Sequence, residues 1–412
     1  MALERHEELA EGAARNHLGV SEETRELYAR HSLGLGIPSS AKKETAGGAM
    51  GELVAGIIKE SRMRFDLIRC GGGFITDNGF VKVVGRRARA RSSAEESLGS
   101  YIARSSGHAV VIEVPGGMSA RLNMLIACGE SDLPLEIVAD VGEGADLSLF
   151  EWYCSVPRGR ALVAPLHAVN AERRSSVEIS LLHNENGNTD VGAVGRIVAH
   201  EGAGVRLNAL YTGGGVTKST MFAEAVGDGS GVSVNEIAFG GAGQRFDIGT
   251  YLLNSGARTS ALLSSGAVMG GGSDCILKGY AKVAKGARGA VSGVEQRGML
   301  LDSKSRAQLL PDMSVECRDV KSASHGASVA PISEEDLFYL MSRGMDSARA
   351  RRTFVASFLS GRLAGMGSDT VKEIALSIML DKLDTGRLSG VPKISARDFW
   401  KVPDAKRDGH EA

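Results

Sequence analysis

The spacing of apolar and polar positions changes twice along the chain, and the first of the three regions has helical spacing. Two stretches in residues 1–65 place apolar side chains on one helical face, "EETRELYARHSL" after Ser21 and "MGELVAGIIKESRMRF". Ser21 is a residue type favoured at a helix N-cap, and "GLGIPSSAKKETAGG" between the stretches is typical of a loop. Residues 1–65 are therefore predicted to form an N-terminal helical region.

From residue 66 to residue 331 the pattern changes to short runs rich in Val, Ile and Leu, punctuated by glycine. Such runs favour strands and turns. A glycine turn followed by an alternating strand recurs at intervals of 27 to 30 residues, and "RRSSVEISLLH" falls within the one interval of double length. The glycines that mark the copies are Gly144, Gly202, Gly229, Gly256 and Gly286.

This repeat indicates a solenoid, because a single unit of strand and turn buries its apolar face only when neighbours stack on it. Propeller blades have longer repeats, and horseshoe repeats carry a leucine and asparagine signature that the chain lacks. Small residues suit the tight corners of a β-helix. The expected fold class is mainly β, with a parallel β-helix core at 66–331.

After the strands, three helices are expected. The first begins at Ser333 in "SEED", a capping-box pattern, and ends near Gly344. The second follows Asp346, and the third follows Ser368 or Asp369.

These helices place a C-terminal helical domain at residues 332–400 and leave 401–412 as a loose tail. At 412 residues, the chain is long enough to bury a large core.

Charge and cysteine content exclude several classes of function. Lys plus Arg number 48 and Asp plus Glu number 49, so the net charge of -1 gives no electrostatic case for nucleic acid or anionic lipid as main partner. The sequence shows neither a secretory leader nor an apolar run of membrane-spanning length, so a cytoplasmic protein without membrane contact is expected. Five scattered cysteines without a CxxC pair predict neither a disulfide framework nor a zinc knuckle.

Motifs of catalysis are missing from the sequence. "GGGVTKST", Gly213 to Thr220, lacks the Gly-Lys-Ser/Thr order of a phosphate loop and is predicted to be a solenoid corner. Neither a GxSxG elbow nor an HExxH helix occurs. An enzyme on a β-helix, such as a polysaccharide lyase, would need a ladder of carboxylates along one face, which the sequence does not show. We therefore expect a non-enzyme that binds no ATP itself.

The segment "SHGASVAPISEEDLFYLMSRGM", Ser324 to Met345, resembles the SufB/SufD family of iron–sulfur cluster assembly proteins, as do "FVASFL" after it and "LLPDMSVECRDVKSASHG" before it. The resemblance is strong from about Ser175 to Leu363 and weaker from about Met50. It implies a right-handed parallel β-helix with helical ends, joined to a partner chain through the end of the β-helix. It also implies a SufC-type ABC ATPase docked on the C-terminal helices and an iron–sulfur cluster assembled transiently near the dimer interface.

Residue by residue, the resemblance yields candidate cluster ligands. His325 matches the histidine of the SufD-type "SHGA" segment, whereas SufB-type chains have an acidic residue in place of Gly326. The SufB-type cysteine expected near Leu301 is missing. Cys317 and Cys275 complete the candidate set, with His325 and Cys317 as metal ligands, because thiolate and imidazole suit iron. The alternative for each cysteine is a place in the apolar core.

The ATPase-docking residues implied by the resemblance lie in the first two C-terminal helices. They are Leu337, Phe338, Leu340, Met341, Arg343, Phe354 and Phe358. The other implied partners are a second copy of the chain or a SufB/SufD homologue, a sulfur donor and recipient apoproteins. Two functions stay open. One is a scaffold that holds the cluster, as an archaeal-type single SufB/SufD homologue would, and the other is a SufD-like structural subunit that supports a separate SufB-like scaffold.

Overall fold

The computed structural model describes most of the chain between residues 47 and 386. The described ranges are 47–61, 63–70, 73–76, 78–85, 98–129, 131–156, 160–364, 366 and 368–386. The helix predicted after Ser21 and the tail predicted at 401–412 lie outside them. The helix predicted from Met50 is present as α3 (Gly47–Ser61).

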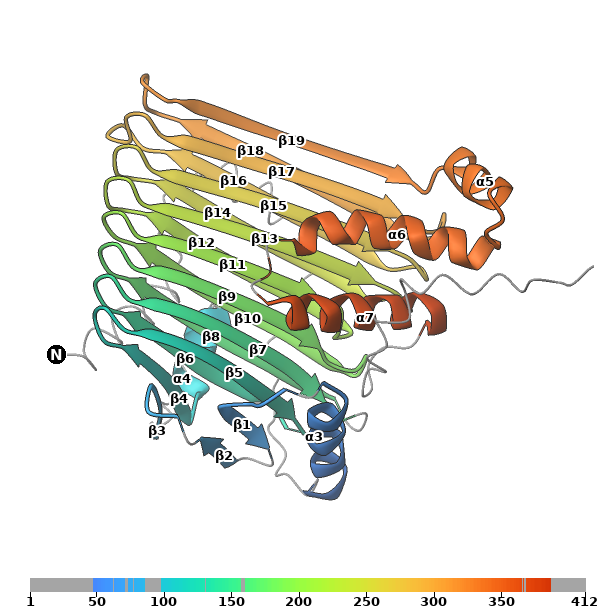
Figure 1. Cartoon of the computed structure of the whole chain (residues 1–412), viewed down its shortest axis with the longest axis horizontal. Coiled ribbons are helices and arrows are strands. Elements are labelled where there is room, and N and C mark those ends of the chain that lie inside the picture. Colours follow the sequence, from blue (N-terminus) through green and yellow to red (C-terminus); the bar gives the residue numbers. More distant parts are fainter. Residues whose placement is uncertain are drawn as a thin grey trace, which may run out of the picture.

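The strands stack in two sheets, with each coil of the chain contributing one strand to each sheet (Figure 1). One sheet has the order β19-β17-β15-β13-β11-β9-β7-β5-β1-β2, and the other β18-β16-β14-β12-β10-β8-β6-β4-β3. Pairing is parallel except for β1 with β2 and β3 with β4. This arrangement confirms the parallel β-solenoid predicted from the repeat.

The strand bounds follow the repeat along the chain. They are β1 (Leu67–Cys70), β2 (Gly73–Thr76), β3 (Val81–Gly85), β4 (His108–Val114), β5 (Ser119–Cys128), β6 (Leu133–Val141), β7 (Asp146–Ser155), β8 (Ala161–Ala171), β9 (Ser176–Asn184), β10 (Thr189–Ala199), β11 (Gly204–Tyr211), β12 (Val216–Ala225), β13 (Gly231–Gly240), β14 (Arg245–Asn254), β15 (Ser260–Met269), β16 (Asp274–Val283), β17 (Val291–Leu300), β18 (Arg306–Val315) and β19 (Ser322–Pro331).

One corner of the solenoid repeats the same left-handed backbone conformation on successive coils. The residues with positive φ at this corner are Gly117, Gly144, Arg174, Gly202, Gly229, Arg258 and Gly289. The N–H of each donates to a carbonyl of the next coil, as from Gly144 to Arg173 O at 2.9 Å. Arg174 confirms that "RRSSVEISLLH" is a copy of the repeat. The predicted turn glycines Gly256 and Gly286 lie in these corners, but the left-handed position falls on Arg258 and Gly289 instead.

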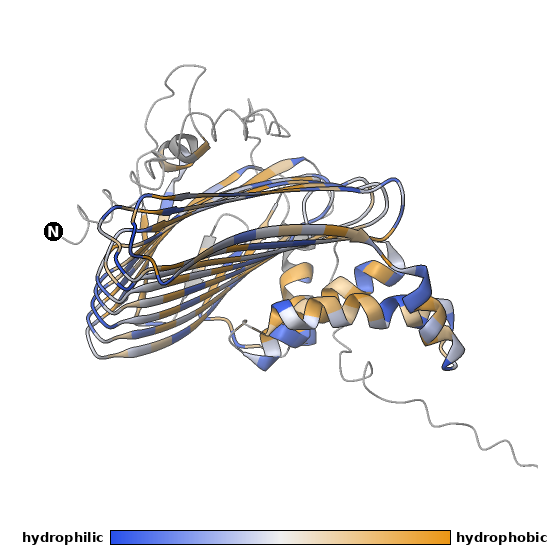
Figure 2. Cartoon of the chain, turned by 90° about the horizontal axis from the view of Figure 1, so that it is seen from above, coloured by the Kyte–Doolittle hydropathy of each residue, from blue (hydrophilic) through white to orange (hydrophobic). Residues whose placement is uncertain are grey.

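The apolar side chains divide between the interior of the solenoid and the outer faces of its sheets. The interior is filled from both sheets, for example by Leu122 and Ile137. On the outer face of the sheet that contains β7 and β13, Trp152 and Phe239 belong to one apolar cluster with residues of α3, α6 (Ser347–Leu363) and α7 (Asp369–Thr385). Figure 2 shows these C-terminal helices beside one sheet only. The short helix α4 (Leu98–Ser105), which the sequence analysis did not predict, packs on the other sheet.

The predicted ends of the C-terminal helices agree with the structure. The Ser333 side chain accepts a hydrogen bond from the Asp336 N–H at the start of α5 (Glu334–Ser342), and Gly344 follows with φ 91°. Asp346 caps α6 in the same way. Of the two alternatives for α7, Ser368 is the N-cap. No helix in the described part of the chain has both the length and the apolar character needed to cross a membrane.

Candidate functional site

The solenoid ends at β18 and β19, and this end is open. Among the described strands, β19 pairs only with β17, and β18 only with β16. All ten residues of β19 are exposed, and small side chains dominate its sequence "SASHGASVAP". The outer edges of the last two strands therefore present backbone N–H and C=O groups that are available to another strand. We call residues 306–331 the open end.

His325 lies on this edge. It is the fourth residue of β19, directly opposite Val294 of β17, and its side chain is exposed. An exposed imidazole on an uncovered strand is accessible to a metal or to a second chain. The structure thus places this candidate ligand at the open end, as the resemblance implies.

Cys317 lies at the corner between β18 and β19, but its side chain faces inward. It is 8% exposed and packs against Val283, Ala287 and Ala290 from the corner of the preceding coil. This thiol is close to the surface of the open end.

Cys275 is in a different place. It is the second residue of β16, is 1% exposed and belongs to the interior core. Burial raises the pKa of its thiol well above the usual value, and nearby carboxylates, Asp247 first, raise it further. The thiol form is therefore strongly favoured over the thiolate that binds iron.

The three candidate ligands do not converge within one chain. β16 and β18 are parallel, with Cys275 opposite Ala307 near their beginning, whereas Cys317 follows the end of β18. The two thiols are separated by most of a strand, roughly 25 Å at about 3.3 Å per residue. Among the described residues, no group of three or more His, Cys, Asp or Glu side chains is placed to hold a metal ion. A cluster site with three or more protein ligands at the open end would need ligands in addition to those that the described residues place together.

The predicted docking residues separate into two groups. On α5, Phe338 is 72% exposed and Met341 is 44% exposed, while Leu337 and Leu340 are partly buried. Tyr339, which the sequence analysis did not select, is 57% exposed and extends the same surface. We call Phe338, Tyr339 and Met341 the α5 patch.

A positively charged side chain, that of Arg343, borders this patch. The Arg343 guanidinium lies 5.2 Å from the centre of the Tyr339 ring and donates to its hydroxyl at 3.3 Å. By contrast, Phe354 and Phe358 of α6 are partly buried against the sheet, and Arg362 lies over the Phe358 ring at 4.3 Å. The two phenylalanines of α6 therefore take part in packing within the chain.

Polar side chains inside the solenoid form a network that the sequence analysis missed. Glu151 accepts a hydrogen bond from the Tyr153 hydroxyl and lies 3.0 Å from His167 Nε2. Burial, followed by the charge of Glu151, raises the pKa of Tyr153 well above its usual value. The residues occur singly within apolar strands, so only the coiling of the chain brings them together.

A second part of the network is stacked on the first. The His183 ring lies between the rings of Tyr153 and Tyr211, at centroid distances of 4.4 and 5.3 Å. His183 Nδ1 lies 2.7 Å from Glu185 Oε1. The interior thus combines apolar packing with paired carboxyl and imidazole groups.

Glu236 belongs to the same interior and leads to a pH prediction. It accepts hydrogen bonds from Thr250 and Ser265, and burial raises the pKa of its carboxyl from 4.5 to about 7. A raised folded-state pKa stabilises the fold at low pH, and this contribution is lost as the pH rises from about 4.5 through 7. The unfolding free energy of the parent chain should fall by roughly 2.5 kcal/mol between pH 5 and pH 8 because of this carboxyl, and Glu236→Gln should lack that fall. Urea unfolding at the two pH values measures it.

The control for this experiment is Glu201→Gln, since Glu201 is exposed on a turn and its side chain lies 3.4 Å from Arg173. It should leave the difference in unfolding free energy between the two pH values unchanged. The same pH dependence in Glu236→Gln and the parent chain would show that Glu236 does not cause it.

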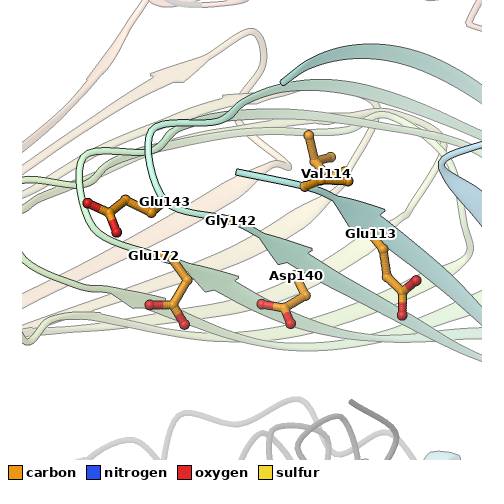
Figure 3. Close-up of a pocket in the computed structure, with 7 residues that line it drawn as sticks. Glu113, Val114, Asp140, Gly142, Glu143 and Glu172 are labelled. Atoms are coloured by element: carbon orange, nitrogen blue, oxygen red, sulfur yellow. The ribbon is translucent and has the colours of Figure 1, made fainter. Parts of the chain in front are cut away.

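A pocket of about 550 Å³ brings carboxylates from adjacent coils together (Figure 3). Lys82 and Arg174 each lie 2.5 Å from a carboxylate oxygen, of Glu113 and Glu143 respectively. Asn170 Nδ2 donates to both Asp140 and Glu172, at 2.8 and 3.1 Å. No sequence pattern predicted this short acidic run, because its carboxylates come from different coils. Its carboxylates are engaged by these neighbours, and the geometry indicates a hydrogen-bonded corner.

Comparison with known families decides where this solenoid belongs. The family model for the SufBD core domain, described as SUF system FeS cluster assembly, matches residues 129–358. This match covers more than half of the chain and includes both the open end and α5. The chain belongs to the SufBD family.

Individual relatives agree with this assignment. An iron–sulfur cluster assembly SufBD family protein of Staphylococcus haemolyticus is 28% identical over 225 residues, which are 54% of this chain and 48% of the relative. A protein of the same description from Staphylococcus aureus strain USA300 is 34% identical over 134 residues, 32% of this chain and 29% of the relative. This SufBD-family chain therefore spans about half or less of the length of these relatives.

Proposed function

We propose that this SufBD-family chain is the scaffold subunit of a SUF-type iron–sulfur cluster assembly complex. It pairs through its open end with a second copy or a homologue, and binds SufC-type ABC ATPases through the α5 patch. It does not hydrolyse ATP itself; ATP hydrolysis belongs to the partner. A cytoplasmic location, a sulfur donor and recipient apoproteins are part of the same proposal.

The observation that supports pairing of two chains is the full exposure of β19. An uncovered strand of ten residues at the end of a sheet is a template for strand addition, and small side chains let another backbone approach closely. Because identical copies associate most often about a two-fold axis, two open ends meeting edge to edge would continue both sheets across the interface.

Docking on α5 is supported by contrast with the neighbouring helices. α6 and α7 bury apolar faces against the solenoid, whereas α5 has no buried residue. A helix that presents two aromatic rings and a methionine, bordered by an arginine, has the composition of a protein-interaction surface.

The cluster is cargo that this scaffold would hold between two chains. His325 is exposed on the edge where the partner would lie, and Cys317 is buried close to it. We propose these two residues of each chain as ligands. Cys275 is the weaker candidate, because its thiol is enclosed at the other end of its strand.

Anaerobic reconstitution tests the proposal against its alternative. The chain is purified with a SufC-type ATPase and without a second SufB-like protein, and bound iron, acid-labile sulfide and visible absorption are measured. Stoichiometric cluster supports the scaffold. An intact complex that binds no cluster would instead identify the chain as the SufD-like structural subunit.

Replacing Cys317 with serine tests the thiolate. If Cys317 is a ligand, iron and sulfide retained after desalting should fall by about tenfold or more, since losing a ligand costs at least as much as losing its outer-shell support. Cys154→Ser, a change at a cysteine buried to a similar extent, is the control and should retain the parent loading. Equal loading in Cys317→Ser and the parent would remove Cys317 from the ligand set.

A further inference from the structure

The glycine-rich strings of the sequence meet at one corner of the solenoid. "GGGVT" connects β11 to β12, "GGAGQ" connects β13 to β14, and "GGGSD" connects β15 to β16. Gly214 and Gly243 have φ of 80° and 72°, and Gly243 N donates to Gly271 O at 2.9 Å. "GGGVTKST" is thus a corner, as predicted. Three successive coils stack their glycines there.

Lys382 of α7 inserts its side chain into this corner. Its ammonium donates three hydrogen bonds, to Thr212 O at 2.6 Å, Phe239 O at 2.5 Å and Gln244 Oε1 at 2.5 Å. The three donors of an ammonium group are therefore all satisfied. The residue is only 6% exposed, and no carboxylate in the described part of the chain forms an ion pair with it. We call Thr212, Phe239 and Gln244 the lysine socket.

The glycines make room for this contact. A Cβ built on Gly241 would lie 3.4 Å from Lys382 Cε, so the lysine stem passes directly over the glycine backbone. Gln244 is itself held in place, because its Nε2 donates to Gly214 O at 2.6 Å. The socket is therefore already assembled by the coils, and α7 supplies only the cation.

Incomplete hydrogen bonding of the Lys382 ammonium would be energetically costly. Burial without a compensating acid lowers the pKa of Lys382 well below its usual value. Charge-assisted hydrogen bonds offset the desolvation only when their geometry is complete. Withdrawal of the ammonium would leave Thr212 O and Phe239 O without this donor. The apolar face of α7, for example Ile374 and Ile378, has no comparable directionality.

α7 is also tied to the helix before it. Arg352 of α6 forms an ion pair with Asp384, two residues after Lys382. α6 in turn leads back to α5 through Gly344 and Asp346. A shift of α7 out of register would therefore carry α6 with it.

We propose that Lys382 is a latch that fixes α7 on the solenoid, and that withdrawal of its ammonium from the lysine socket frees the C-terminal helices to move. This inference concerns the chain by itself and goes beyond the proposed function. It is tested without an ATPase or a cluster, so its failure would leave the proposed function unaffected.

Hydrogen exchange of Lys382→Met tests the latch. Methionine keeps an unbranched apolar stem but has no donors. Amide exchange should rise by at least about tenfold in α7 and in residues 212–215 and 240–244, because three charge-assisted bonds are lost. Exchange in β6–β9 should not change. Lys372→Met is the matched control on the same helix, since Lys372 pairs with the exposed Asp369 at the surface, and it should exchange like the parent.

Chemical rescue separates a latch from general packing. Lys382→Ala removes three carbons and the ammonium, which n-propylammonium reproduces. Adding n-propylammonium chloride should restore protection of α7, whereas tetramethylammonium chloride, which has no N–H donor, should not. Faster exchange that neither salt reverses would assign Lys382 to packing and overturn the latch.

The unmodified chain supplies a measurement that does not depend on folding of a variant. In exchange at increasing urea concentrations, α7 and the lysine socket should open as one unit, with the same urea dependence and at a lower free energy than the strands. Separate opening of α7 and the socket, or opening only together with the whole solenoid, would reject the proposal, as would unchanged exchange in Lys382→Met.

Discussion

Replacement of Phe338 by serine should weaken binding of a SufC-type ATPase by about 30-fold or more. Phe338 is the most exposed of the large apolar side chains in the described part of the chain, at 72%. An aromatic side chain at the centre of an interface commonly contributes at least about 2 kcal/mol, which corresponds to this factor in the dissociation constant. Binding is measured by isothermal titration calorimetry with the full chain.

The free chain should be unaffected, because Phe338 buries little surface within it. Thermal unfolding of Phe338→Ser should therefore match the parent. Met118→Ser, which removes a side chain 46% exposed on a turn far from α5 in the sequence, is the control and should bind the ATPase normally. An unchanged dissociation constant for Phe338→Ser would show that the ATPase docks elsewhere.

A proline in β19 should disrupt pairing of two chains by about 100-fold, provided that it removes an N–H directed outward. Adjacent residues of a strand direct their N–H groups to opposite edges, so Ala327→Pro and Ser328→Pro form a matched pair. One variant loses a bond across the interface, and the other loses a bond to β17. The outward proline leaves a carbonyl of the partner strand without its donor, which costs about 1–3 kcal/mol. A two-fold pair contains this site twice, so the dissociation constant should rise on the order of 100-fold.

Sedimentation equilibrium and thermal unfolding distinguish the two variants. The outward variant should be monomeric at concentrations where the parent pairs, with its monomer stability unchanged. The inward variant should unfold at lower temperature. Parent-like association in both variants would show that the edge of β19 is not the interface.

The helix N-caps and the turns of the repeat could be predicted from short segments, because the interactions that define them are local. Ser333, Asp346 and Ser368 each cap a helix through a bond to an N–H three residues away. The glycine turns recur because each coil needs a left-handed residue at the same corner. Arginine occupies that position at Arg174 and Arg258, so glycine spacing missed the first turn and placed the second two residues early. At the next corner Gly286 precedes the left-handed Gly289 by three residues, because that corner contains two glycines.

The sequence predicted where the candidate site lies, but not which of its side chains are accessible. The segment around His325 pointed to the end of the solenoid, and the structure places it there on an exposed edge. The burial of Cys275 agrees with the core position that the sequence offered as the alternative to a ligand. The inward orientation of Cys317 depends on the packing of its corner against the preceding coil. Tyr339 was not among the docking residues that the resemblance implied, and its exposure follows only from the structure, in which α5 buries no residue.

The repeat, the helix ends and the family segment are properties of the sequence by itself, because each rests on residues within about one coil of one another. Tertiary structure alone decided the rest. The pairing of Glu151 with His167, the carboxylates that share one pocket, and the insertion of Lys382 beside Thr212 join positions 16, about 30 and 170 residues apart. Such contacts depend on the register in which the coils stack and on the place where α7 crosses them, which no local pattern encodes.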